Sequence, residues 1–229
     1  MIELRNVTKK YGKKTILDDV SLTFEKGKIS CLLGLNGVGK STTMKSIMRL
    51  VPITKGQILL EGKPVNEKNI DSIAFLADVP THDLNWTVEE NLKMANIYYD
   101  SFDMDKAWRM VEFFKLPKER RLKELSKGNL ARFTIVIGLS QNAPYVLMDE
   151  PFSGIDIFSR EEFIASLKSD FMIEGQTIII TTHEIDEIES IADHVFLLEE
   201  GKVLCSFSKE EADREGFTIV EKMRKIYRG

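Results

Sequence analysis

The chain has 229 residues, of which 43% are hydrophobic and 30% are charged, and its formal net charge is -4. This composition is ordinary for a soluble globular protein with a sizeable core, and it argues against a disordered or fibrous chain. The negative net charge argues against a protein that coats nucleic acid in general, so we expect no nucleic-acid partner.

The sequence shows neither a membrane span nor a secretory signal. No apolar stretch approaches the length of about 18 residues that a membrane helix requires, and residues 1–5 do not open a long apolar core. We therefore expect the chain to stay in the cytoplasm. Cys31 lies in a predicted core strand and Cys205 lies near another, which favours reduced packing residues over a disulfide or a metal-binding pair.

The first part of the chain alternates short β-prone segments with turns. Residues 17–24 and 58–60 are each followed by a turn that contains glycine, and this pattern predicts an antiparallel sheet. In the same region, the apolar run 29–33 predicts a buried strand, and residues 41–50 predict a helix.

The loop between that strand and that helix fits the phosphate-binding pattern G-x-x-x-x-G-K-[ST]. Its glycines let backbone N–H groups surround phosphate oxygens, and the start of the helix adds a partial positive charge. We predict a nucleoside triphosphate site, in which Lys40 contacts the β- and γ-phosphates and Ser41 ligates Mg²⁺. The alternative is a glycine turn with a solvated lysine. The predicted nucleotide-binding residues of the loop are Gly34, Leu35, Asn36, Gly37, Val38, Gly39, Lys40, Ser41 and Thr42.

The pattern becomes helical after residue 86. Thr87 and Glu90 are spaced as a capping box, and Asp103 is expected to cap another helix. The apolar residues after Asp103 recur at helical spacing, which favours core packing over a ligand-binding cluster. We therefore predict a helical subdomain over residues 87–143.

The last third of the chain returns to strands. The continuous apolar or β-branched runs 145–148 and 177–180 predict central strands of a parallel sheet that is covered on both faces. Residues 195–198 and 203–205 predict a closing hairpin, and a charged helix is expected to follow.

These elements predict a single domain over residues 1–229. Its nucleotide-binding core comprises residues 1–86 and 144–207, and the helical subdomain 87–143 is inserted between them. Residues 208–229 are predicted to form one C-terminal helix.

Two carboxylates follow the strand 145–148 directly. At the end of a strand, Asp149 is placed to hold Mg²⁺ and Glu150 is placed to polarise an attacking water. Taken alone, such a pair is usually only a turn, but the phosphate-binding loop favours the catalytic interpretation. His183 follows the next apolar strand, so we expect it at the same sheet edge, close to the γ-phosphate.

With these motifs in order, the chain resembles the ATP-binding subunits of ABC transporters over nearly its whole length. The resemblance implies that residues 125–129 form the signature segment, which binds the γ-phosphate of ATP held by the opposite subunit. Ser126 and Gly128 match that segment, whereas Lys127 and Asn129 depart from it.

The resemblance also assigns roles outside the signature segment. Tyr11 aligns with the aromatic residue that stacks on adenine, and residues 153–156 align with the loop that crosses the dimer interface. His183 becomes the switch histidine. Asp78 stands where the family commonly has a glutamine that touches Mg²⁺, so we expect a metal-side role for its carboxylate, with a solvated loop acid as the alternative.

The fold that the resemblance implies is an α/β P-loop NTPase of the ABC type. It has a mixed central sheet flanked by helices, an antiparallel β subdomain and an inserted α-helical subdomain. The implied activity is ATP hydrolysis, with ATP and Mg²⁺ as cofactors and with Lys40, Glu150 and His183 as the catalytic residues.

The implied partners are a second ATP-binding subunit, identical or paralogous, and a separate transmembrane permease. The chain would then lie peripherally on the cytoplasmic face of the cell membrane. The signature segment and the short carboxyl end resemble exporter ATPases of the ABC-2 type, including peptide and antibiotic-resistance exporters. Two alternatives are a soluble ABC ATPase without a membrane partner and a regulatory subunit that hydrolyses ATP weakly.

Overall fold

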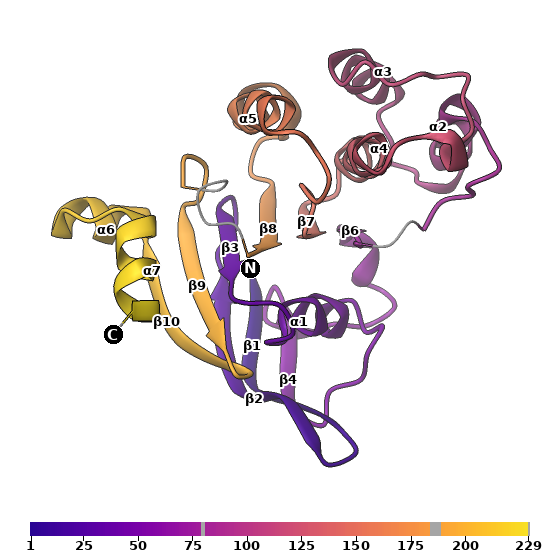
Figure 1. The fold of residues 1–229 in the computed structure, drawn as a ribbon. Helices are drawn as coiled ribbons and strands as arrows, with labels where there is room; N and C mark the ends of the chain where they lie inside the picture. The colour runs from indigo at the N-terminus through magenta and orange to yellow at the C-terminus, as the bar shows by residue number, and fades with distance from the viewer. Residues whose placement is uncertain (79–80, 184–188, 229) are drawn as a thin grey trace.

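A computed structural model describes residues 1–78, 81–183 and 189–228, and it contains two sheets (Figure 1). The antiparallel sheet has the order β2-β1-β4-β5 and consists of β1 (Ile2–Tyr11), β2 (Lys14–Phe24), β4 (Lys55–Leu60) and β5 (Lys63–Pro64). It confirms the predicted antiparallel sheet. The second sheet has the order β10-β9-β3-β8-β7-β6. Its strands are β3 (Ile29–Leu33), β6 (Ile73–Leu76), β7 (Tyr145–Asp149), β8 (Thr177–Thr182), β9 (His194–Glu199) and β10 (Lys202–Ser208).

The second sheet is mixed, as predicted. Strands β9, β3, β8, β7 and β6 run parallel to one another, and β10 returns antiparallel to β9 as the expected hairpin. The strand order places β3 between β9 and β8. In such sheets, ligands bind beyond the carboxyl ends of the parallel strands, so the loop after β3 has a central position.

Alternate residues of the parallel strands face opposite sides of the sheet. Leu32, Leu147 and Ile179 pack in one core cluster with the antiparallel sheet and α1 (Lys40–Ile47). Cys31 and Met148 belong to a second cluster, which includes residues of the helices on the other face. Because both faces are covered, these strands read as continuous apolar runs in the sequence.

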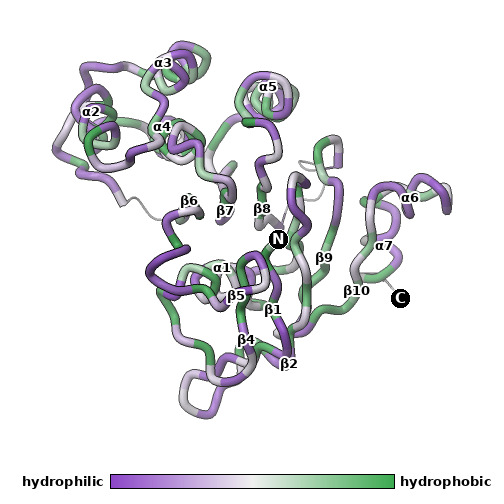
Figure 2. The backbone as a smooth tube through the Cα atoms, turned by 180° about the vertical axis from the view of Figure 1, so that it is seen from behind, coloured by the Kyte–Doolittle hydropathy of each residue, from purple (hydrophilic) through white to green (hydrophobic). Residues whose placement is uncertain are grey.

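The predicted helical region contains α2 (Val88–Tyr98), α3 (Met104–Phe113) and α4 (Lys127–Ser140), which gather beside β6 and β7 (Figure 1). The capping box is present: Glu90 donates its N–H to Thr87 Oγ1 at 3.1 Å, and Thr87 donates its N–H to Glu90 Oε2 at 2.7 Å. Asp103 caps α3, as predicted. Figure 2 shows mixed hydrophilic and hydrophobic turns along α2, α3 and α5 (Ile157–Ser166), as expected for helices with one buried face.

The predicted single helix over residues 208–229 is wrong. The structure has two helices there, α6 (Lys209–Glu215) and α7 (Ile219–Arg228). Gly216 ends α6 in the left-handed conformation, with φ 72°, and Thr218 accepts a hydrogen bond from the N–H of Glu221 at the start of α7. A left-handed glycine stops a helix because it turns the backbone out of the helical path.

The remaining regular segments are short helical turns at Ile70–Ser72, Leu122–Glu124 and Leu167–Phe171. Among the described residues, no helix is long and apolar enough to cross a membrane. Cys31 and Cys205 are free thiols, and burial raises the pKa of Cys31 far above its usual range.

Helix α4 lies against β6 with very little space at Gly138. A Cβ atom added at Gly138 would lie 2.1 Å from Leu76 Cδ1. We predict that Gly138→Ala lowers the free energy of unfolding by about 1–3 kcal/mol because Leu76 must repack. Denaturant unfolding measures the change. Asn96→Ala, at an exposed position of α2, is the matched control and is expected to be neutral. Equal midpoints for Gly138→Ala and the wild type would contradict this packing.

Candidate active site

The predicted phosphate-binding loop connects β3 to α1. A Cβ atom added at Gly34 would lie 2.3 Å from the carbonyl oxygen of Leu198, and Gly39 has φ 116° at the residue before α1. Both positions therefore require glycine. The loop ends on the backbone N–H groups of the first turn of α1, which is a favourable position for phosphate.

Lys40 is the first residue of α1 and is almost completely buried, with 4% of its side chain exposed. Its Nζ donates hydrogen bonds to the carbonyl oxygens of Gly34 at 2.7 Å and Leu35 at 3.3 Å. The same atom lies 3.2 Å from Glu150 Oε1, as an ion pair without hydrogen-bond geometry. A buried ammonium needs such partners to offset its lost hydration. The loop thus holds one cation at its centre.

Asp149 is buried at the carboxyl end of β7. Its Oδ1 accepts hydrogen bonds from Ser41 Oγ at 3.0 Å and from Thr181 Oγ1 at 2.7 Å. Its Oδ2 is buried and receives no hydrogen bond from the described residues. Such an orphaned oxygen calls for a ligand. Mg²⁺ prefers oxygen ligands such as carboxylates and hydroxyls. Asp149 and Ser41 together therefore fit a magnesium ion.

No group of three His, Cys, Asp or Glu side chains suited to a metal ion occurs in the described part of the chain. The candidate ligands that the structure does bring together are Asp149 and Ser41. This is the usual arrangement for Mg²⁺ at nucleotide sites, where phosphate and water complete the coordination.

Glu150 follows β7 in the left-handed conformation, with φ 49°. Its N–H donates to both the carbonyl oxygen and the Oγ1 of Thr181, each at 3.1 Å. A strained backbone of this kind persists only where the surrounding structure holds it. The Oε2 atom lies 2.9 Å from His183 Nδ1, so the structure brings His183 to the sheet edge at which the sequence predicts it.

Thr181 is a site residue that sequence reasoning missed. Its hydroxyl donates to Asp149 and accepts from the N–H of Glu150, so one side chain holds both carboxylate residues. The available signal is the pair Thr181-Thr182, which ends an otherwise apolar β-branched run immediately before His183.

Tyr11 and Asp78 both reach the cleft beside the phosphate-binding loop. Tyr11 is 52% exposed, and Asp78 is also exposed. The residues that line the cleft are Tyr11, Ile16, Asn36, Gly37, Gly39, Lys40, Ser41, Thr42, Asp78 and Glu150. The structure therefore gathers the predicted adenine-stacking, phosphate-binding and metal-side residues around one opening.

The predicted signature segment lies at the start of α4, and none of its residues lines this cleft. Ser126 caps the helix by accepting a hydrogen bond from the N–H of Asn129 at 3.2 Å. A Cβ atom added at Gly128 would lie 2.4 Å from the carbonyl oxygen of Gly154, so glycine is required there for close packing. Neither Ser126 nor Gly128 lines the cleft that contains Lys40 of the same chain.

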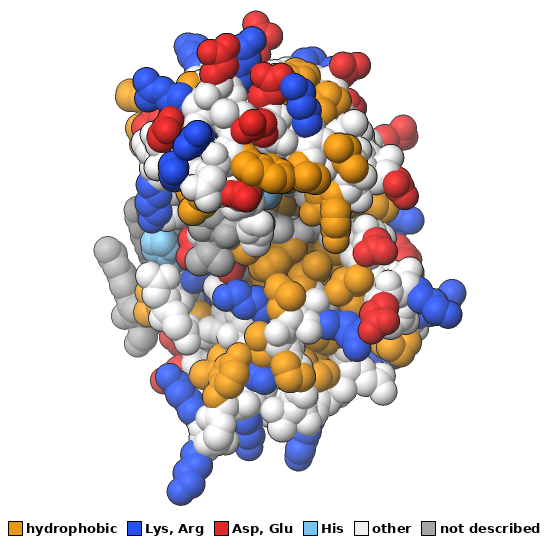
Figure 3. All heavy atoms as spheres, turned by 90° about the vertical axis from the view of Figure 1, so that its right-hand side faces the viewer, with side chains coloured by type: hydrophobic (Ala, Val, Ile, Leu, Met, Phe, Trp, Pro, Cys, Tyr) orange, Lys and Arg blue, Asp and Glu red, His pale blue; other side chains and the backbone are white. Residues whose placement is uncertain are grey.

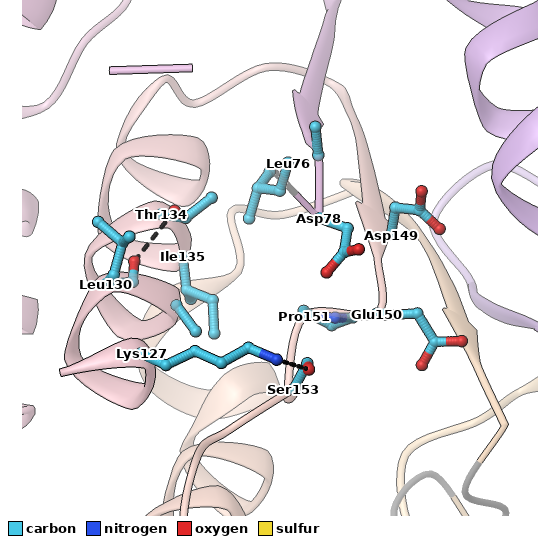
Figure 4. Close-up of a pocket in the computed structure, with 12 residues that line it drawn as sticks. Leu76, Asp78, Lys127, Leu130, Thr134, Ile135, Asp149, Glu150, Pro151 and Ser153 are labelled. Atoms are coloured by element: carbon cyan, nitrogen blue, oxygen red, sulfur yellow. Dashed lines mark hydrogen bonds between the residues drawn. The ribbon is translucent and has the colours of Figure 1, made fainter. Parts of the chain in front are cut away.

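Two cations connect α4 to the segment 153–159. Lys127 Nζ donates to Ser153 Oγ at 3.1 Å, across a pocket that Asp78, Asp149 and Glu150 also line (Figure 4). One turn further along α4, Arg132 forms an ion pair with Asp156 and donates to Ser159 Oγ at 2.8 Å. Lys127, which departs from the expected signature, is therefore part of the packing between the signature turn and the following loop.

The sequence of this chain is similar to those of known proteins. A family profile described as ABC transporter matches residues 17–153. The lantibiotic transport ATP-binding protein SrtF of Streptococcus pyogenes is 32% identical over 206 residues, which cover 89% of each chain. The Nod factor export ATP-binding protein I of Burkholderia lata is 34% identical over 213 residues, covering 89% of this chain and 69% of the relative. The petrobactin import ATP-binding protein YclP of Bacillus subtilis is 28% identical over 222 residues, covering 92% and 88%.

The fold is also similar to solved structures. One described as the ATP binding subunit of an ABC transporter superposes with a TM-score of 0.85 and covers 99% of both chains, at 24% sequence identity. This similarity shows a common fold over the whole chain.

The hydroxyl of Thr181 supports the site by a buried hydrogen bond to Asp149 and a partly buried one from the N–H of Glu150. We predict that Thr181→Val, which keeps the side-chain shape, lowers the free energy of unfolding by about 1–3 kcal/mol because Asp149 Oδ1 and the N–H of Glu150 each lose a partner. Denaturant unfolding measures the loss. Thr23→Val, at an exposed position of β2, is the matched control and is expected to change stability little. Equal losses in the two variants would mean that the hydroxyl of Thr181 has no special role.

Proposed function

This chain belongs to the ABC transporter family and is an ATP-binding subunit with ATP hydrolase activity, and from that premise we propose that it drives export through a separate membrane protein by Mg²⁺-dependent hydrolysis in a two-chain assembly. The observation that carries the proposal is the convergence of Lys40, Asp149, Glu150 and His183 at one edge of the sheet. These are the groups that phosphate binding, metal binding and activation of a water molecule require.

The chain's own residues would act in a defined order. The phosphate-binding loop and Lys40 would bind the triphosphate, and Ser41 and Asp149 would hold Mg²⁺, which would supply charge neutralisation at the phosphates. Lys40 is within ion-pair distance of Glu150, so a bound phosphate would compete for the ammonium and release the carboxylate. Glu150 then orients the attacking water, and His183 holds the opposite carboxylate oxygen.

A second ATP-binding subunit is proposed because the signature segment does not reach the cleft of its own chain. Ser126 and Gly128 would instead contact ATP held by another chain. The residues that follow the loop 153–156 support such an interface, since Ile157 is 53% exposed and Phe158 is 79% exposed. Exposed apolar side chains of this size favour burial against a partner. An identical chain and a paralogue both fit this arrangement.

A permease is proposed to contact the face beside β6 and the helical subdomain. Hydrophobic side chains gather in a hollow on the face shown in Figure 3. On α2, Met94, Ile97 and Tyr98 are exposed at helical spacing, and Ile97 is 76% exposed. Attachment to a membrane protein would place the chain peripherally on the cytoplasmic face of the membrane.

The direction of transport is proposed from relatives and not from the site. One relative is named for Nod factor export, whereas another is named for petrobactin import. The signature segment with Lys127 and Asn129 favours the exporter subgroup. The carboxylate of Asp78, in place of glutamine, favours a second candidate, a regulatory subunit that hydrolyses ATP weakly.

The central test uses Glu150→Gln. The amide keeps the shape of the side chain but is a poor base, so we expect Mg²⁺-dependent ATP hydrolysis to fall by at least about 100-fold while ATP binding is retained. The variant should accumulate as an ATP-bound dimer, which light scattering detects. Glu162→Gln, on the exposed surface of α5, is the control and should hydrolyse ATP at the wild-type rate. Undiminished turnover in Glu150→Gln would refute the assignment.

The same assay separates a motor from a regulatory subunit. Wild-type turnover that rises more than linearly with protein concentration would support a complete homodimer. Absent turnover and absent dimerisation would indicate a different obligate partner or a regulatory role.

The proposed metal-side role of Asp78 has its own test. We expect Asp78→Ala to raise the Mg²⁺ concentration that gives half-maximal hydrolysis by about 10-fold, because a carboxylate that acts on a metal directly or through water tunes its affinity. Asp71→Ala, at an exposed position near β6, is the control. If Asp78→Ala leaves the Mg²⁺ dependence and turnover unchanged, Asp78 is a solvated loop acid.

A further inference from the structure

Lys9 lies behind the exposed ring of Tyr11. Its Nζ is 4.4 Å from the centroid of that ring, within the distance of a cation–π interaction. The two residues differ sharply in burial, since Lys9 is 6% exposed and Tyr11 is 52% exposed. The ammonium therefore covers a protein-side face of the ring, and the ring itself lines the cleft with Lys40 and Ser41.

The ammonium of Lys9 is held in place by backbone. It donates a hydrogen bond of 2.6 Å to the carbonyl oxygen of Pro52. The segment that carries this carbonyl is itself fixed to β1, because Thr54 donates its N–H to the carbonyl oxygen of Thr8 at 2.7 Å and accepts from the N–H of Lys10 at 3.0 Å. The side chain of Lys9 is thus buried and held at its end by a hydrogen bond, unlike a solvated surface lysine.

Lys9 has no ion-pair partner among the described residues of the chain. Its remaining strong interaction is with the π face of Tyr11. A buried cation without a carboxylate is unfavourable unless dipoles and polarisable groups surround it. The carbonyl group of Pro52 supplies a dipole and the ring of Tyr11 supplies a polarisable π face. Removal of the charge on Lys9 would therefore abolish its contact with the ring and leave the ring less firmly held.

We propose that Lys9 is a positioning residue for the nucleobase: it fixes the ring of Tyr11 from the protein side so that a purine stacks on the opposite face. The inference rests on the proposed stacking role of Tyr11. A ring that is already fixed loses less conformational freedom when a base binds, and preorganisation of this kind increases affinity. A ligand with phosphates but no base would gain nothing from Lys9.

The test compares ATP with tripolyphosphate, which has the phosphates but lacks the base. Equilibrium dissociation constants are measured with the full chain for the wild type, Lys9→Met and Lys9→Arg. We expect Lys9→Met to weaken ATP binding about fivefold, as for the loss of one cation–π contact, and to leave tripolyphosphate binding unchanged. Lys9→Arg keeps the cation and should restore ATP affinity. Lys10→Met, at the exposed neighbouring lysine of β1, is the control and should match the wild type.

Tyr11→Ala separates the predicted stacking role of Tyr11 from the proposed positioning role of Lys9. If Tyr11→Ala leaves ATP affinity unchanged, the stacking role of Tyr11 fails, and the inference about Lys9 fails with it. If Tyr11→Ala weakens ATP binding and Lys9→Met does not, only the inference about Lys9 is overturned.

A double variant tests the coupling directly. With Tyr11 already replaced by alanine, Lys9→Met should have no further effect on ATP affinity, because residues that act through one another are not additive. Additive losses would overturn the inference. Equal losses for ATP and tripolyphosphate in Lys9→Met would also overturn it, since the lysine would then support the fold or the phosphate loop. Tripolyphosphate binding also reports whether each variant is folded.

Discussion

The candidate site depends on the hydrogen bonds that the buried carboxylate of Asp149 accepts, because they join three segments that are distant in the sequence. Its Oδ1 accepts hydrogen bonds from Ser41, at the start of α1, and from Thr181, at the end of β8. The contact with Thr181 follows from the parallel register, since Asp149 is paired with Thr181 across β7 and β8. A shift of one residue would turn Asp149 to the other face of the sheet and separate it from the loop.

The same edge stores strain where the reaction is proposed to occur. Glu150 is left-handed, and its N–H donates to both the carbonyl oxygen and the hydroxyl of Thr181 on the neighbouring strand. This turn directs one carboxylate oxygen to Lys40 and the other to His183. The carboxylate therefore links the ammonium of Lys40 to the imidazole of His183, and a ligand that engaged Lys40 would compete with Glu150 for it.

The start of α4 is tied to the segment after Glu150 in a way that motif matching does not reveal. Gly128 is packed on the backbone of Gly154, and Lys127 reaches Ser153. A displacement of the start of α4 would therefore also displace the loop that follows Glu150. Lys127 departs from the usual signature, yet in this chain it provides that connection, so the departure has a physical role in the fold.

The sequence alone determined the glycine-rich loop between β3 and α1, the parallel strands at 145–148 and 177–180, the helical region after residue 86 and the caps at Thr87 and Asp103, because each depends on local spacing or on residue chemistry at one position. Tertiary structure decided what depends on distant partners: the bridging role of Thr181, the left-handed Glu150 and the contact of Lys9 with the ring of Tyr11. It also decided the C-terminal break, since Gly216 inside a charged, helix-prone segment is ambiguous until the backbone shows it left-handed. Local sequence encodes propensity, whereas contacts between segments are fixed only when the sheet is assembled.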